Sequence, residues 1–116
     1  MRKMKIGATK RILINFNSSI LTDLNDAAVL SLEAYLFVDR RKLLAFKKGG
    51  GVGFDGDIER DSVQNNVGII KLTEALSGRL VPGLLRMEVW LKKNVGGVTE
   101  AYDFTLDVTT VEGAIK

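Results

Sequence analysis

The stretch that decides the fold covers residues 80–108 and reads LVPGLLRMEVWLKKNVGGVTEAYDFTLDV. A Pro-Gly pair opens a segment of alternating apolar and polar side chains, a Gly-Gly pair follows, and a second alternating segment ends the stretch. Successive side chains of a β-strand point to opposite faces, so each segment has one apolar face. The residues expected to face a core are Leu85, Met87, Val89, Leu91, Tyr102, Phe104, Leu106 and Val108. This pattern predicts an amphipathic β-hairpin.

A second long strand is predicted over residues 29–38. Its apolar face would carry Leu30, Leu32, Ala34, Leu36 and Val38. Leu, Glu and Ala also suit a helix, but the period of two and the flanking turn residues favour a strand. Further strands are expected over 10–17, 42–47, 55–61 and 67–72, with a turn of helix or a tight crossover at 73–78. Short strands separated by turn residues at intervals of about ten are typical of a β-sandwich.

The composition excludes several classes of chemistry. The 116 residues are 46% hydrophobic and 27% charged, as in one globular domain. The chain has no cysteine, so it forms neither disulfides nor thiolate metal sites, and no histidine, so imidazole ligands and histidine-based triads are excluded. We therefore predict a protein that is not an enzyme, with no catalytic residue, no cofactor and no bound metal.

The charges are distributed unevenly along the chain. Residues 1–48 contain ten basic and four acidic side chains, whereas residues 49–116 contain seven basic and ten acidic ones. We predict that residues 1–9 form a solvated basic arm, with electrostatic pairing between the halves of neighbouring copies as an alternative. Nucleic acid is not favoured as a partner, because no aromatic residue lies among the bases of the arm. A membrane is not favoured either, because no apolar run reaches spanning length.

The order of these motifs resembles the immunoglobulin-like N-terminal module of phage baseplate upper proteins. The matching pieces are the polar loop 23–28 with its Asp-Leu pair, the long strand 29–38, the strand 67–72, the Val-Pro-Gly corner at 81–83 and the final alternating strand at 102–108. The chain departs from the family in carrying Leu84 and Leu85 directly after the Pro-Gly pair, where members often carry aromatic residues. It also ends near the close of the module, without the long extension that bears receptor-binding proteins.

The resemblance implies an all-β, immunoglobulin-like antiparallel β-sandwich of about seven strands that spans residues 1–116 as one domain. It also implies a non-enzymatic structural protein of a tailed-phage virion, placed in the baseplate, the tail or a capsid-associated position. Such a protein would contact other virion proteins and copies of itself in a symmetric assembly, and would bind no small-molecule substrate. The alternative, from a different class, is a stand-alone carbohydrate-binding module.

The glycine-rich segment 48–56 invites comparison with a phosphate-binding loop. Gly51 and Gly56 have the required four-residue gap, but Asp57 and Ile58 occupy the positions where such a loop needs Lys and Ser or Thr. Without the lysine, no cation faces the phosphates. We therefore predict a flexible loop and not a nucleotide site.

Four acids alternate along the next segment, as at the start of a calcium loop: Asp55, Asp57, Glu59 and Asp61. However, Arg60 stands where that loop needs its glycine, and Asn66 replaces its bidentate glutamate. If the segment is a strand, the four acids line one solvated edge. We predict the solvated edge, with a weak calcium site as the alternative.

The residues expected to make protein contacts are Arg2, Lys3, Lys5, Tyr35 and Trp90. Trp90 belongs to the polar face of its strand, and Tyr35 to the corresponding face of the strand 29–38. Exposed aromatic rings on a sheet serve as protein interfaces or as platforms for sugars. We favour an interface, and burial of the rings beneath loops or the second sheet remains the alternative.

Overall fold

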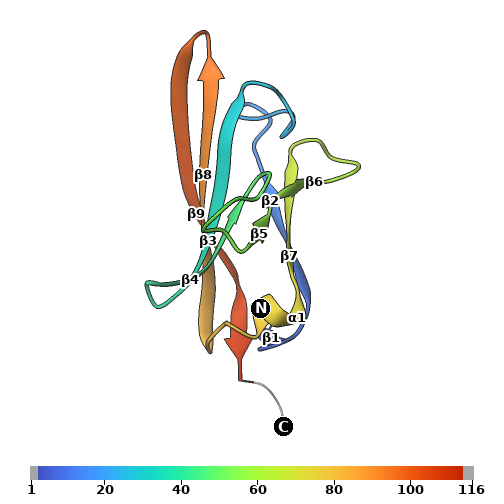
Figure 1. The fold of residues 1–116 in the computed structure, drawn as a ribbon, viewed down its shortest axis with the longest axis vertical. Helices are drawn as coiled ribbons and strands as arrows, with labels where there is room; N and C mark the ends of the chain where they lie inside the picture. The colour runs from blue at the N-terminus through green and yellow to red at the C-terminus, as the bar shows by residue number, and fades with distance from the viewer. Residues whose placement is uncertain (1–2, 114–116) are drawn as a thin grey trace.

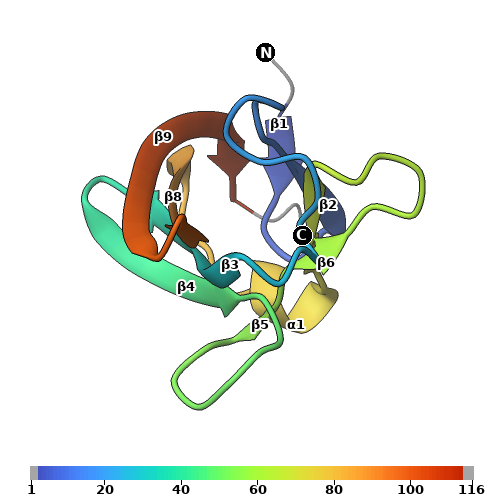
Figure 2. The same cartoon turned by 90° about the horizontal axis from the view of Figure 1, so that it is seen from above.

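Two β-sheets pack face to face in the computed structural model, which describes residues 3–113 (Figures 1 and 2). In chain order the elements are β1 (Lys3–Lys5), β2 (Lys10–Asn15), β3 (Val29–Val38), β4 (Arg41–Lys47), β5 (Gly56–Asp57), β6 (Glu59–Arg60), β7 (Val67–Leu72), α1 (Glu74–Ser77), β8 (Gly83–Val95) and β9 (Val98–Glu112). The larger sheet has the order β1-β9-β8-β3-β4-β5, and the smaller has the order β2-β7-β6. The β8–β9 hairpin projects beyond the other elements at one end (Figure 1).

This strand order is that of an immunoglobulin-like sandwich. The smaller sheet β2-β7-β6 corresponds to strands B, E and D of immunoglobulin domains, and β9-β8-β3-β4 corresponds to G, F, C and C′. The predicted fold class is therefore confirmed. Two short pairings, β1 with β9 and β4 with β5, are parallel, whereas the other pairings are antiparallel.

The centre of the core is built from two apolar rows that the sequence predicts, and the structure places them on neighbouring strands of the larger sheet. β3 and β8 pair antiparallel, and the inward row of each is buried: Leu32, Ala34, Leu36 and Val38 on β3, and Leu85, Met87, Val89 and Leu91 on β8. Burying a side chain of this size contributes about 1.5–3 kcal/mol, so these rows are the main attachment of the larger sheet to the smaller.

Of the three register shifts in the larger sheet, two change the predicted faces. The register of β3 against β8 shifts between Val29 and Ser31, and Leu30 is 53% exposed instead of facing the core. The register of β8 against β9 shifts between Leu85 and Arg86. The extra residue in β9 turns Thr109 inward, so Thr109 is buried.

Residues 55–61 do not form one polar strand, which corrects the prediction. They contribute the two-residue strands β5 and β6, which belong to different sheets. Ile58 lies between them and is almost fully buried. As the chief apolar side chain of a polar run, Ile58 anchors the chain in the core where it crosses from one sheet to the other.

The predicted basic arm is also corrected for the residues that are described. Lys3–Lys5 forms β1, which pairs with β9, and the side chain of Met4 is buried in the core. The alternation Lys-Met-Lys-Ile over residues 3–6 is the sequence signal for this strand. Arg2 lies outside the described residues.

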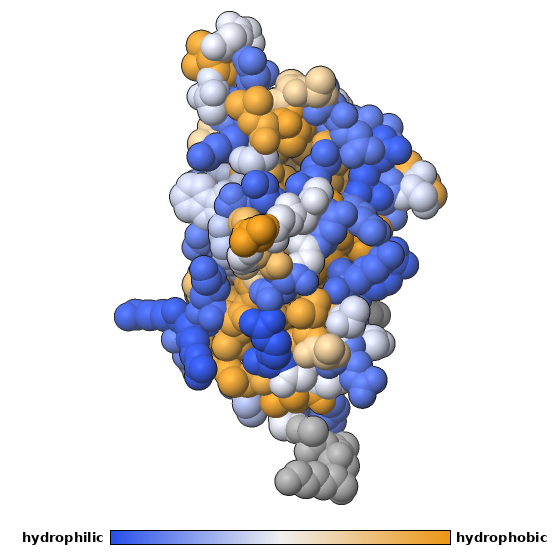
Figure 3. Space-filling model, in the orientation of Figure 1, coloured by the Kyte–Doolittle hydropathy of each residue, from blue (hydrophilic) through white to orange (hydrophobic). Residues whose placement is uncertain are grey.

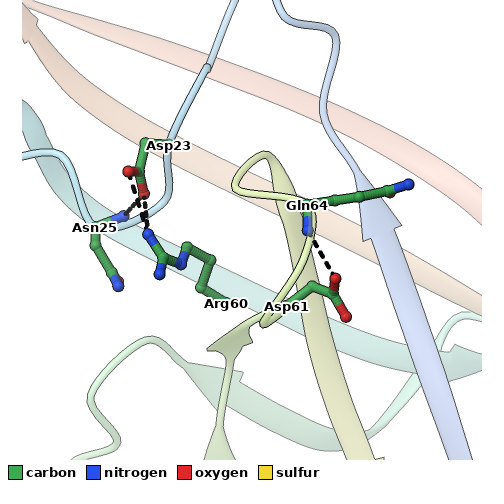
Figure 4. Close-up of polar contacts among 5 residues, drawn as sticks. All are labelled: Asp23, Asn25, Arg60, Asp61 and Gln64. Carbon is green, nitrogen blue, oxygen red and sulfur yellow. Dashed lines mark hydrogen bonds and ion pairs between the residues drawn. The ribbon is translucent and has the colours of Figure 1, made fainter.

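The loop before β3 is attached to β6 by an ion pair (Figure 4). Asp23 accepts hydrogen bonds from the Asn25 amide at 2.8 Å and from Arg60 Nη1 at 3.1 Å. These two bonds, with the Arg60 charge, outweigh desolvation and hold the pKa of Asp23 below its ordinary value. Leu24, next in the chain, is fully buried. The Asp-Leu pair therefore closes one end of the sandwich, with the acid on the surface and the leucine in the core.

Candidate functional site

The candidate site is the face of β3 and β8 that points away from the core, hereafter the outer face. It consists of Ser31, Glu33, Tyr35 and Phe37 on β3 and Arg86, Glu88, Trp90 and Lys92 on β8. The strands place Glu33 beside Trp90 and Tyr35 beside Glu88. Each aromatic side chain of this face therefore has a charged side chain opposite it on the neighbouring strand.

Each carboxylate on this face holds the polar group of an aromatic side chain on its own strand. The Tyr35 hydroxyl donates to Glu33 Oε1 at 2.6 Å, and Trp90 Nε1 donates to Glu88 Oε1 at 2.5 Å. The bond to Glu33, together with burial and the charges of Glu33 and Glu88, raises the pKa of Tyr35 to about 12. The raised pKa means that the hydroxyl keeps its proton, and with it the hydrogen bond to Glu33, further into the alkaline range than an ordinary tyrosine.

The surroundings of the two rings leave them accessible. Trp90 is 38% exposed, and Tyr35 is half-buried, so neither ring is covered by the smaller sheet. Lys42 Nζ lies 5.1 Å from the centroid of the Tyr35 ring, and Phe54 lies 6.4 Å from it, centroid to centroid. The face therefore offers large rigid rings bordered by both signs of charge.

Two shallow hollows mark the outer face. One is lined by Ser31, Glu33, Tyr35, Trp90 and Lys92, and the other by Phe37, Arg40, Arg86, Glu88 and Thr105. In the view of Figure 3, apolar patches lie interspersed among polar surface, and one lies at the tip of the molecule where the β8–β9 hairpin projects. The hollows are open to solvent, which suits a broad contact better than an enclosed ligand.

The other predicted contact residues lie away from the outer face. Lys3 Nζ and Lys5 Nζ lie 3.3 Å and 2.5 Å from the carboxylate of Glu112, at the end of β9. The hydrogen bond from Lys5 is the main cause that holds the pKa of Glu112 below its ordinary value. The structure therefore brings Tyr35 and Trp90 together and places the two lysines at the β1 edge.

The four acids of residues 55–61 are held by separate partners. Asp55 accepts from the Ala45 amide and from Arg79, and Glu59 pairs with Lys71. The remaining acids, Asp57 and Asp61, accept from backbone amides of neighbouring loop residues. No group of three or more metal-ligating side chains comes together within residues 3–113, so the alternative of a calcium site gains no support.

Asp55 fastens the glycine-rich segment to the sandwich. Burial raises the pKa of Asp55, but the hydrogen bonds from Ala45 and Arg79 outweigh this effect, and the pKa lies below its ordinary value. The Gly49 amide is likewise held by Asp57 Oδ1 at 2.6 Å. The glycine-rich segment 48–56, predicted as a flexible loop without a nucleotide, is therefore held near both ends by hydrogen bonds to the carboxylates of Asp55 and Asp57.

Sequence reasoning missed Glu33 and Glu88 as members of the site. Alternation placed them on the polar faces, but their neighbours depend on the register between β3 and β8, which the sequence does not give. The Glu-x-Tyr spacing at 33–35 and the Glu-x-Trp spacing at 88–90 are the available signal, because residues two apart on a strand share a face.

Comparisons with protein-family models, with curated proteins and with solved structures each found no match to this chain. Within the described part of the chain, no helix has the length and apolar character needed to cross a membrane.

Proposed function

We propose that this protein is a non-enzymatic structural component of a tailed-phage virion, and that it works by contact with copies of itself and with other virion proteins. The virion setting rests on the motif order that resembles the baseplate upper proteins. The contact role rests on one observation, the outer face with Tyr35 and Trp90 held in fixed orientations and left accessible. Detection of the chain in purified particles by mass spectrometry tests the setting.

Physical arguments support an interface on this face. Tyr and Trp are enriched among the residues that carry most of the binding energy, because they bury a large area at a small cost in conformational entropy. Here the bonds to Glu33 and Glu88 fix the rings before binding, which lowers that cost further. Acids and bases both border the rings, so one alignment of a partner copy sets opposite charges together and is favoured over the others.

Replacing Trp90 by alanine is expected to leave the monomer folded and to weaken self-association. Truncating a central aromatic contact costs about 2 kcal/mol, or roughly 30-fold in the dissociation constant. Light scattering across a dilution series measures the change. The matched control is Val63→Ala, which also removes an exposed apolar side chain but from the turn before β7. Equal association of Trp90→Ala and the unmodified protein would contradict the proposed interface.

A second candidate function, sugar binding, is favoured by the carboxylates beside the rings. Glu33 and Glu88 lie next to Tyr35 and Trp90, and a carboxylate accepts hydrogen bonds from sugar hydroxyls while a ring stacks on the sugar face. A glycan array separates the two functions. Specific sugar binding by a monomer that does not self-associate would favour the carbohydrate-binding module.

A further inference from the structure

One side of the sandwich has two free strand edges. β2 pairs with β7 on one side only, and β9 pairs with β8 on one side and with β1 only through residues 110–112. Within residues 3–113, no strand lies against the other edge of β2 or against β9 between Val98 and Val108. Free edges present unpaired backbone donors and acceptors, which are able to pair with a strand of another molecule.

The two edges face the same side of the molecule, and the core is open between them. A surface hollow is lined by residues 10–13 of β2 and 106–108 of β9, and it reaches the otherwise buried Met87. Leu106 pairs with Met87 in the inward row of the sheet but is 37% exposed. Its exposure corrects the predicted core position. The surface hollow opens beside Leu106, whereas nearer the hairpin the Phe104 ring packs against the Phe16 ring at 5.8 Å, centroid to centroid.

The two edges carry opposite charges. β2 contains Lys10 and Arg11 and no acid, whereas β9 contains four acids and no base: Glu100, Asp103, Asp107 and Glu112. No ion pair joins Lys10, Arg11 or Asp103 to another side chain of the described chain. Pairing β9 with another β9 would set acids against acids, whereas pairing β9 with β2 sets acids against bases.

We propose that a second copy of this chain closes this side, with the β2 edge of each copy paired to the β9 edge of the other. β2 and β9 run in opposite directions (Figure 1). A two-fold rotation about an axis parallel to the strands sets the smaller sheet of one copy beside the larger sheet of the other and leaves every strand direction unchanged. The β2 edge of each copy then meets the β9 edge of the other. Both pairings are antiparallel and equivalent, as an isologous interface requires.

This pairing also covers the exposed Leu106. The inward row of β2, whose Ile12 and Ile14 are already buried within one copy, would continue the row that contains Leu106 in the partner copy. On the opposite face of the joined sheet, Arg11 of one copy would lie beside the outward acids Asp103 and Asp107 of the other. The inference adds a second interface to the proposed self-association. Its acids border the outer face, because Asp103 pairs with Trp90 and Asp107 accepts a hydrogen bond from Arg86 Nε at 3.1 Å.

A charge-swap experiment tests the edge pairing. Lys10→Glu with Arg11→Glu makes both edges acidic, and Asp103→Lys with Asp107→Lys makes both edges basic. Each double variant alone is expected to associate at least ~10-fold more weakly than the unmodified protein. An equimolar mixture is expected to regain association as a one-to-one heterodimer, visible by native mass spectrometry. Arg41→Glu with Lys48→Glu, at the first residue of β4 and the residue directly after its end, makes the same change in net charge as Lys10→Glu with Arg11→Glu but away from the two edges and the outer face, and it should retain association.

Two outcomes would overturn the edge pairing: full association of either double variant alone, or no recovery on mixing. Circular dichroism checks that each variant is folded. If a variant does not fold, the salt dependence of the unmodified protein decides, because pairing of opposite charges weakens as salt rises and an association unaffected by salt contradicts it. Failure of the outer-face proposal is distinguishable, since Trp90→Ala would then associate normally while the mixture still recovers.

Discussion

Replacing Leu24 by alanine is expected to lower the free energy of unfolding by about 2–5 kcal/mol. Leu24 is fully buried at the end of the core, where an added Cβ on Gly68 would come within 3.2 Å of Leu24 Cδ2. The shorter side chain leaves a cavity at that point. The surrounding loop cannot collapse into it, because the Leu24 amide is bonded to the Asn65 carbonyl at 3.0 Å and Asp23 is bonded to Arg60. Urea unfolding measures the loss.

The matched control is Leu30→Ala, the same chemical change six residues along the chain. Leu30 is exposed at the bulge in β3, so its replacement is expected to change stability by no more than about 0.5 kcal/mol. Equal losses at the two positions would contradict the described core. They would mean that Leu30 is buried like Leu24, as in a strand without the bulge between Val29 and Ser31.

Replacing Gly83 by alanine is expected to destabilise the protein by about 2–4 kcal/mol, the sum of two effects. Gly83 starts β8 with a φ of +137°, which side chains rarely adopt, and an added Cβ would lie 2.7 Å from Val38 Cγ1. Both atoms belong to the tightly paired β3 and β8, so the clash cannot relax cheaply. Thermal unfolding monitored by circular dichroism measures the change.

Gly53→Ala separates the two effects. Gly53 has a φ of +88° and no atom within 4 Å of an added Cβ, so this variant carries the backbone strain without the clash. Its expected loss is about 1 kcal/mol, at the low end for such strain. If Gly83→Ala were no more harmful than Gly53→Ala, the close approach of β8 to β3 at the Pro-Gly corner would be wrong.

The strands with strict alternation were predictable from sequence, because a period of two has one physical explanation. The buried rows of β3 and β8 are the residues that alternation selects, from Leu32 and Leu85 onward. The bulges were not predictable, since they depend on how two strands fit and not on either sequence alone. Leu30 and Leu106 were predicted to face the core and are exposed instead. A bulge displaces Leu30, and Leu106 lies beside an open edge.

The short strands were the hardest to predict. β1, β5 and β6 have two or three residues each, too few for a periodic signal, and they exist because longer strands offer them an edge. The site was predictable in part. Tyr35 and Trp90 follow from alternation, whereas their proximity and the roles of Glu33 and Glu88 depend on the register.

The most direct test of the account is the fluorescence of Trp90 as a function of protein concentration. The chain has a single tryptophan, so its emission reports on the outer face alone. If copies dock through this face, the emission maximum moves to shorter wavelengths as the concentration rises and the indole leaves water. Light scattering on the same samples gives the size of the assembly. Growth of the assembly with an unchanged emission maximum, or a monomer at every concentration, would contradict docking through Tyr35 and Trp90.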